Sequence, residues 1–246
     1  MIKKITLVSL CTTITFNAPL YAGSMGDMDF NNWGAVFVSL EGSYTKNAIE
    51  NFNFNIIGTN NSFFSVKKNQ LYGARLAAGA IGKLIDEFGV SAELGWGYYG
   101  RTKLDGIGTG IFETNRSTLS ETNTLTGFDL LVGASFLQPC YSLFLKAGAL
   151  AQTNNVNFNS AFFPTAFTSD RFRFKASITS ILPEVKLGGS YIFNENWALT
   201  LAYMHAFGSA SKTTANFDPV TFTSNFDTNL RNPSLHSVMV GVQVSI

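Results

Sequence analysis

The chain has 246 residues, enough for one large β domain, and its formal net charge is only +1. Charged residues make up 13% and aromatic residues 14%, so the composition is too apolar for a disordered chain. The near-neutral charge excludes a general electrostatic attraction to nucleic acid, and we expect no nucleic-acid partner.

The first 22 residues follow the order of a secretory signal peptide. Lys3 and Lys4 precede a mainly apolar stretch over 5–16, and a small-residue site follows at Ala22-Gly23. This stretch is far shorter than the roughly 20 residues that a spanning helix needs. We therefore predict a cleaved signal peptide over 1–22, a short N-terminal segment over 23–32, and a single further domain over 33–246.

Beyond the predicted signal, apolar and other residues alternate with the period of two that β-strands require. In 88–99, for example, Val90, Leu94 and Trp96 share one face, whereas Ser91 and Glu93 share the other. Eight segments show this pattern, in chain order 33–44, 71–83, 88–99, 125–137, 141–151, 172–192, 197–207 and 235–246. The even number and the alternation predict a closed antiparallel β-barrel that spans a membrane, with one face toward lipid and the other toward the lumen.

The predicted connections alternate between short and long. Tight links fall at 84–87, 138–140 and 193–196, whereas 45–70, 100–124, 152–171 and 208–234 are long and rich in Asn, Thr, Ser and Phe. Short periplasmic turns and long extracellular loops are typical of outer-membrane barrels. The sequence therefore predicts an all-β, eight-stranded, antiparallel up-and-down transmembrane barrel, with strands that extend beyond the membrane where Phe alternates with Asn.

The chain ends in Gly241-Val242-Gln243-Val244-Ser245-Ile246. This resembles the C-terminal signal that the barrel assembly machinery reads, with Gly241, Val244 and Ile246 at its key positions. Over 33–246 the alternation pattern resembles the eight-stranded OmpA-like and opacity-type surface proteins, grouped as outer membrane protein β-barrel domains. The resemblance implies a monomer in the outer membrane, exported through its signal peptide, with outer-membrane lipid and lipopolysaccharide as neighbours.

The inward register carries a set of charged residues that nearly cancel. Four acids and three bases share it: Glu41, Arg75, Glu93, Asp129, Lys146, Glu184 and Lys186. Buried charges persist when they are paired and hydrogen-bonded, and the interior of an eight-stranded barrel is narrow enough for side chains to fill. We therefore hypothesise an ion-pair network that plugs the lumen. The alternative is that these charges line a small porin-like channel for ions or small solutes.

The predicted outer loops are the second candidate surface. They are rich in Phe, and loops on rigid scaffolds often carry function, so a host or surface ligand is one hypothesis. Packing among these rings, or against lipid, is the alternative. Arg101, Lys103, Arg171 and Arg173 lie near the predicted outer rim and are candidates for lipopolysaccharide phosphates. We expect a structural or surface-interaction role, such as envelope integrity, adhesion or surface antigen.

No motif predicts catalysis, a metal or a cofactor. His236 and Ser237 are adjacent and therefore point to opposite faces of a strand, which separates a base from a nucleophile. Cys140 is the only cysteine outside the predicted signal, and no Cys, His and Asp cluster has the spacing of metal ligands. The glycine-rich run 106–110 lacks the strand–helix context of a phosphate loop and is predicted to be a flexible loop. A lipid-modifying enzyme is the least favoured alternative.

Overall fold

A computed structural model describes residues 35–49, 53–56, 62–67, 70–85, 87–109, 116–163, 170–194, 196–209, 212–218, 223–229 and 231–246. The predicted signal peptide and the segment 23–32 lie outside the described residues. Every regular element in the described ranges is a β-strand. These ranges contain no helix with the length and hydropathy needed to cross a membrane.

Twelve strands are described. They are β1 (Ala35–Asn47), β2 (Asn53–Ile56), β3 (Ser62–Lys67), β4 (Gln70–Ile85), β5 (Phe88–Thr109), β6 (Arg116–Leu137), β7 (Tyr141–Phe163), β8 (Asp170–Asn194), β9 (Trp197–Ala206), β10 (Lys212–Asp218), β11 (Thr223–Asn229) and β12 (Leu235–Ser245).

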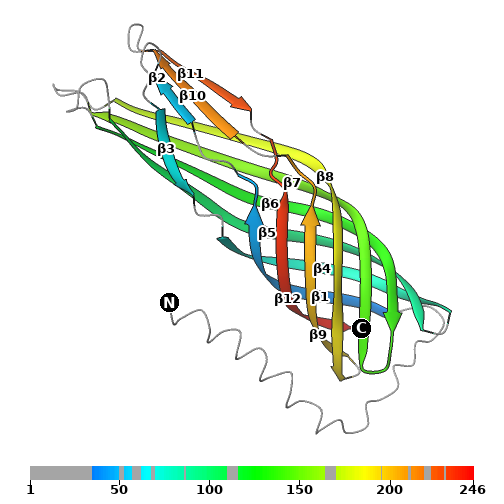
Figure 1. Cartoon of the computed structure of the whole chain (residues 1–246). Helices are drawn as coiled ribbons and strands as arrows, with labels where there is room; N and C mark the ends of the chain where they lie inside the picture. Colours follow the sequence, from blue (N-terminus) through cyan, green and yellow to red (C-terminus); the bar gives the residue numbers. More distant parts are fainter. Residues whose placement is uncertain are drawn as a thin grey trace, which may run out of the picture.

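Eight of these strands form a closed antiparallel ring. Its order is β1, β4, β5, β6, β7, β8, β9 and β12, and β12 pairs again with β1. The closing pair runs from Phe37 opposite Ser245 to Asn47 opposite Leu235, so the first and last ring strands leave no free edge in the barrel wall (Figure 1). The predicted eight-stranded barrel is confirmed.

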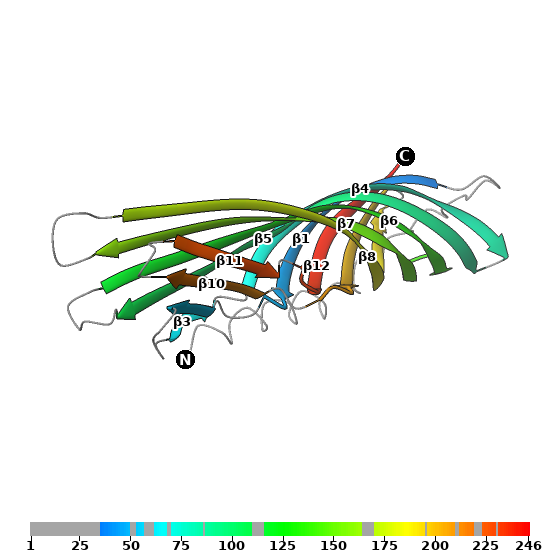
Figure 2. The ribbon, with the colours of Figure 1, turned by 90° about the horizontal axis from the view of Figure 1, so that it is seen from above.

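The ring strands have unequal lengths. β5, β6, β7 and β8 have 22 to 25 residues each, whereas β1, β9 and β12 have 10 to 13. The long strands continue past the barrel as a sheet, which Figure 2 shows projecting to one side. β3 pairs with β5, β2 with β3, and β10 with both β2 and β11. We call this second part the outer sheet.

The outer sheet corrects two expectations about the connections. Most of 100–124 and 152–171 is strand, not loop, and the run predicted to be a flexible loop belongs to β5 from Gly106 to Thr109. Pairing explains the difference, because β6 and β7 each have a partner strand on both sides, and their Thr residues favour strands. The three short turns lie where they were predicted.

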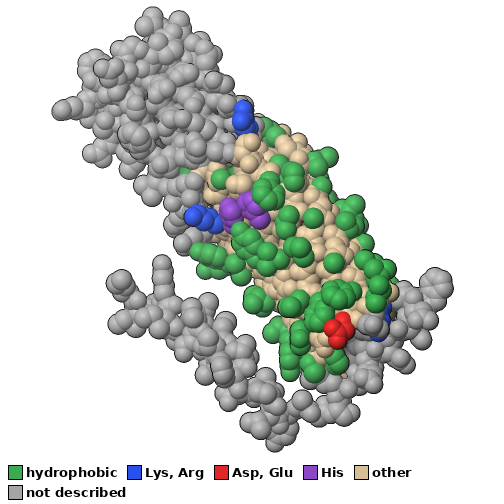
Figure 3. Space-filling model, turned by 45° about the vertical axis from the view of Figure 1, so that its right-hand side comes forward, with side chains coloured by type: hydrophobic (Ala, Val, Ile, Leu, Met, Phe, Trp, Pro, Cys, Tyr) green, Lys and Arg blue, Asp and Glu red, His purple; other side chains and the backbone are tan. Residues whose placement is uncertain are grey.

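The polarity of the barrel is inverted relative to a water-soluble domain. Large apolar side chains on the outer face are exposed, among them Leu94, Leu130, Leu145 and Leu201 at 58–60%. Figure 3 shows hydrophobic side chains spread over the barrel surface. Inward-facing polar and charged side chains are buried. An apolar exterior around a polar interior is the arrangement of a membrane-spanning barrel, and bacterial barrels of this kind lie in the outer membrane.

Candidate functional site

The seven charged residues predicted to face the lumen are all buried there. Glu41 lies on β1, Arg75 on β4, Glu93 on β5, Asp129 on β6, Lys146 on β7, and Glu184 and Lys186 on β8, with exposed fractions of 1–6%. Alternation along each strand places them inside, because their neighbours in sequence face outward. Six strands therefore contribute charges to one level of the barrel.

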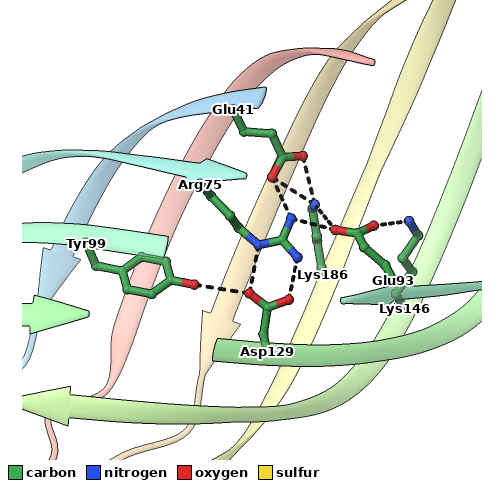
Figure 4. A network of polar contacts seen from close by, with 7 residues as sticks. All are labelled: Glu41, Arg75, Glu93, Tyr99, Asp129, Lys146 and Lys186. Atoms are coloured by element: carbon green, nitrogen blue, oxygen red, sulfur yellow. Dashed lines mark hydrogen bonds and ion pairs between the residues drawn. The ribbon is translucent and has the colours of Figure 1, made fainter. Parts of the chain in front are cut away.

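Arg75 is the centre of this level. Its Nε donates to Asp129 Oδ2 at 2.8 Å, and its Nη2 donates to the other oxygen of the same carboxylate. Its Nη1 donates to Glu41 Oε2 at 2.8 Å and lies 2.5 Å from Glu93 Oε1. The planar guanidinium thus holds three carboxylates from three strands (Figure 4), an arrangement that its fixed donor geometry favours.

Two lysines complete the charge balance. Lys186 Nζ donates to Glu41 at 2.8 and 3.0 Å and to Glu93 Oε1 at 2.9 Å, and Lys146 Nζ donates to Glu93 Oε2. Three acids and three bases therefore form one connected and neutral group, which we call the lumen network. Tyr99 extends it by donating to Asp129 Oδ2 at 3.4 Å.

A glycine leaves room for the lumen network, and two aromatic rings pack against it. A Cβ added to Gly95 would lie 2.7 Å from Arg75 Cζ, so the guanidinium occupies the volume that any other residue would fill. On the side of the short turns, Lys146 Nζ lies 5.1 Å from the ring centre of Phe37 and 4.8 Å from that of Phe144. These rings support the ammonium group through cation–π attraction.

Glu184 does not join the lumen network. Its side chain is buried, yet neither carboxylate oxygen has a hydrogen-bond partner among the described residues. The charges of Asp129, Arg75 and Lys186 act on it, but Arg75 and Lys186 form their ion pairs with other acids. Register alone predicted seven interacting charges, whereas the structure brings six together and leaves one acid over.

An apolar layer covers the lumen network on the side of the outer sheet. Sequence reasoning missed this layer, although all of the members given below lie on the inward register of the predicted segments. Its members are buried and packed as one cluster: Leu71, Tyr99, Leu125, Leu150, Leu182, Met204 and Leu235. Continuous side-chain packing therefore follows the charges along the barrel axis.

The histidine and serine that sequence reasoning tested for catalysis lie on opposite sides of the wall. Ser237 is buried inside, where its Oγ lies 2.7 Å from Thr45 Oγ1. His236 is on the outer face and contacts Tyr203. The two side chains are therefore separated by the strand, as alternation predicted.

The residues of the predicted assembly signal form the last part of β12 and the chain end. Gly241 packs directly against Glu41, Val244 pairs with Val38 and Trp197, and the Ile246 amide donates to the Val36 carbonyl at 2.8 Å. The Ile246 side chain is 86% exposed. Recognition by the assembly machinery stays a prediction.

Comparison with known proteins gives similarity only at the level of three-dimensional structure. No family model and no curated protein matches the sequence. OprG from Pseudomonas aeruginosa is similar with a TM-score of 0.46 and 12% identity, over 88% of this chain and 98% of that one. Ail of Yersinia pestis, in complex with the heparin analogue sucrose octasulfate, has a TM-score of 0.40 and 12% identity, over 87% and 99%. The outer membrane protease OmpT from Escherichia coli has a TM-score of 0.42 and 9% identity, over 89% and 98%.

These neighbours are outer-membrane barrels with different roles. At such low identities and TM-scores they say nothing about the activity of this chain. Function therefore has to be inferred from its own lumen and surface.

Proposed function

We propose that this protein is an outer-membrane barrel with a sealed lumen, which anchors and presents the outer sheet in a structural or surface-interaction role such as envelope integrity, adhesion or surface antigen. The observation that carries the proposal is the burial of the lumen network. The side chains of Arg75 and Lys186 are 0% and 1% exposed. A water-filled pore would instead leave its lining charges hydrated.

Energetics support the same reading. Breaking a buried ion pair costs about 3–5 kcal/mol, and Arg75 takes part in three such pairs. The lumen network links β1, β4, β5, β6, β7 and β8, so opening it requires several pairs to break together. The apolar layer above it adds a second barrier, because ions would have to leave water to pass those side chains.

The outer sheet supports the surface role. It extends β5 to β8 beyond the apolar outer face of the barrel as a paired sheet. Rigid scaffolds are suited to the display of loops and faces that bind partners.

Conductance of the purified protein in planar bilayers tests the sealed lumen. We expect no steady openings for the wild type. Arg75→Ala should give at least brief openings, since this change removes the side chain that holds three acids together and leaves the apolar layer as the remaining barrier. Arg101→Ala is the matched control because Arg101 is exposed on the outer face of β5, and it should leave the bilayer silent.

Steady openings of appreciable size in the wild type would contradict the sealed lumen and favour a small porin-like channel. A lipid-modifying enzyme has less support than either, since the one histidine–serine pair considered as catalytic is split by the barrel wall.

A further inference from the structure

The outer surface of the barrel carries a pair of histidines. His205 on β9 and His236 on β12 are direct cross-strand partners, and their ring centres are 4.2 Å apart with planes inclined by 31°. The chain has no other histidine. Figure 3 shows both side chains in contact on the outer face, beside the apolar belt.

Each ring is oriented by a hydrogen bond through Nδ1. His205 Nδ1 lies 3.0 Å from the backbone carbonyl of Leu235, and His236 Nδ1 lies 2.7 Å from Tyr203 Oη. A carbonyl only accepts, so His205 carries its proton on Nδ1 and has a lone pair on Nε2. A hydrogen bond of this kind to the second ring nitrogen is typical of metal-binding histidines, because it fixes the tautomer and orients the ring.

The opposite nitrogens are available to a ligand. Within the part of the chain that the structure describes, no hydrogen bond reaches Nε2 of either histidine. Phe207 packs edge-on against His205, with ring centres 4.2 Å apart, and restricts its rotation. Tyr203 Oη can accept from the Nδ1–H of His236, which leaves a lone pair on Nε2 of this ring as well. Two neighbouring imidazoles with lone pairs on Nε2 can bind one metal ion together, since imidazole nitrogen suits Cu²⁺, Ni²⁺ and Zn²⁺.

We propose that His205 and His236 together bind one divalent transition-metal ion at the outer rim of the barrel. The described residues contain no group of three or more His, Cys, Asp or Glu side chains able to hold a metal. The two histidines therefore supply two ligands, and water or lipid phosphate oxygens fill the other positions. Cu²⁺ binds such nitrogen ligands most tightly among the divalent first-row metals.

The positive charge of the neighbouring Lys46 should weaken metal binding by the two histidines. Lys46 is the cross-strand partner of His236 on β1, it is exposed, and its charge acts on His236. An ammonium group so close opposes a bound cation. Replacing it with a neutral side chain should therefore strengthen metal binding without touching a ligand.

Titration of the full-length, tag-free barrel with Cu²⁺, followed by calorimetry in detergent micelles at neutral pH, tests the site. We expect one ion per barrel, and about tenfold or greater loss of affinity in His205→Ala and in His236→Ala, because each leaves a single ligand. Tyr203→Phe should weaken binding about tenfold through loss of the orienting hydrogen bond. Lys46→Gln should strengthen it about threefold at low salt.

Electron paramagnetic resonance of the Cu²⁺ complex gives an independent readout, since two coordinated imidazole nitrogens have a characteristic hyperfine pattern. Heat-modifiable migration on gels shows that each variant is folded. Absence of saturable binding in the folded wild type would overturn the proposal. So would undiminished binding in the double variant His205→Ala/His236→Ala, because the ion would then lie elsewhere.

Discussion

Charge balance in the lumen depends on individual residues. Glu93 contacts Arg75, Lys146 and Lys186, and it is the only ion-pair partner of Lys146 among the described residues. Glu184 is equally buried but has no such partner. Two glutamates on the same inner surface therefore have opposite energetic roles. A buried acid stabilises the fold when it is paired, and it costs free energy when it is not.

We therefore predict opposite outcomes for two isosteric substitutions. Glu93→Gln should destabilise the barrel by about 3–5 kcal/mol, since it leaves Lys146 as a buried and unpaired charge. Glu184→Gln should be neutral or stabilising, because it removes a carboxylate that has no partner. Urea unfolding in lipid vesicles measures both free energies. Equal destabilisation by the two variants would contradict this prediction, because it would show that the Glu184 carboxylate is paired when the barrel lies in a membrane.

At the scale of elements, β8 changes character along its length. From Glu184 to Tyr191 it pairs with β7 on one side and β9 on the other. From Asp170 to Leu182 it pairs with β7, and no strand on the other side is found among the described residues. This outer half is an edge strand, and its Arg173 and Lys175 are exposed. Basic residues on an edge discourage pairing with another chain.

Hydrogen exchange should show this change within the one strand. Between Arg171 and Ile181 we expect about every second amide to exchange fast, because alternate amides of an edge strand have no acceptor. Amides of Val185–Tyr191 should be protected. The control is Glu121–Leu125 of β6, which lies in the outer sheet but pairs on both sides. Uniform protection of β8 would mean that a further strand covers its edge.

At the scale of the whole molecule, polarity divides the exterior into two zones. The barrel presents apolar side chains to lipid. Beyond them, exposed polar side chains follow on those parts of β5 and β8 whose side chains the structure describes. Arg101 and Lys103 on β5, and Arg173 and Lys175 on β8, are exposed in this second zone. In an outer membrane, the lipopolysaccharide headgroups would lie at this level. The Arg171 side chain, also predicted to contact phosphate, lies outside the described residues.

We predict that these bases bind lipopolysaccharide phosphates. The triple variant Arg101→Ala/Arg173→Ala/Lys175→Ala should bind lipopolysaccharide micelles about fivefold to tenfold more weakly at low salt. Lys83→Ala is the control. It also removes a positive charge, but at the end of β4 that adjoins a short turn, and it should leave lipopolysaccharide binding unchanged. Equal binding to dephosphorylated lipopolysaccharide would contradict a role for phosphate.

Which side chains face lipid and which face the lumen follows from the order of the amino acids alone. Glu93 is inside and Leu94 outside because successive side chains of a strand point to opposite faces, and no tertiary contact changes that. The even number of ring strands and the positions of the short turns follow from the same alternation and its interruptions. The polar stretches of the outer sheet were predicted to be loops, because Asn, Thr and Ser also favour turns.

Which of these side chains contact one another depends instead on how the strands are arranged in the folded barrel. Ring closure and strand stagger bring Arg75 to Asp129 and leave Glu184 without a partner, although all three share the same inward register. They also make β9 and β12 neighbours across the intervening β10 and β11, which places His205 against His236. Alternation fixes a face within one strand, whereas contacts between strands depend on their order and stagger in the closed sheet.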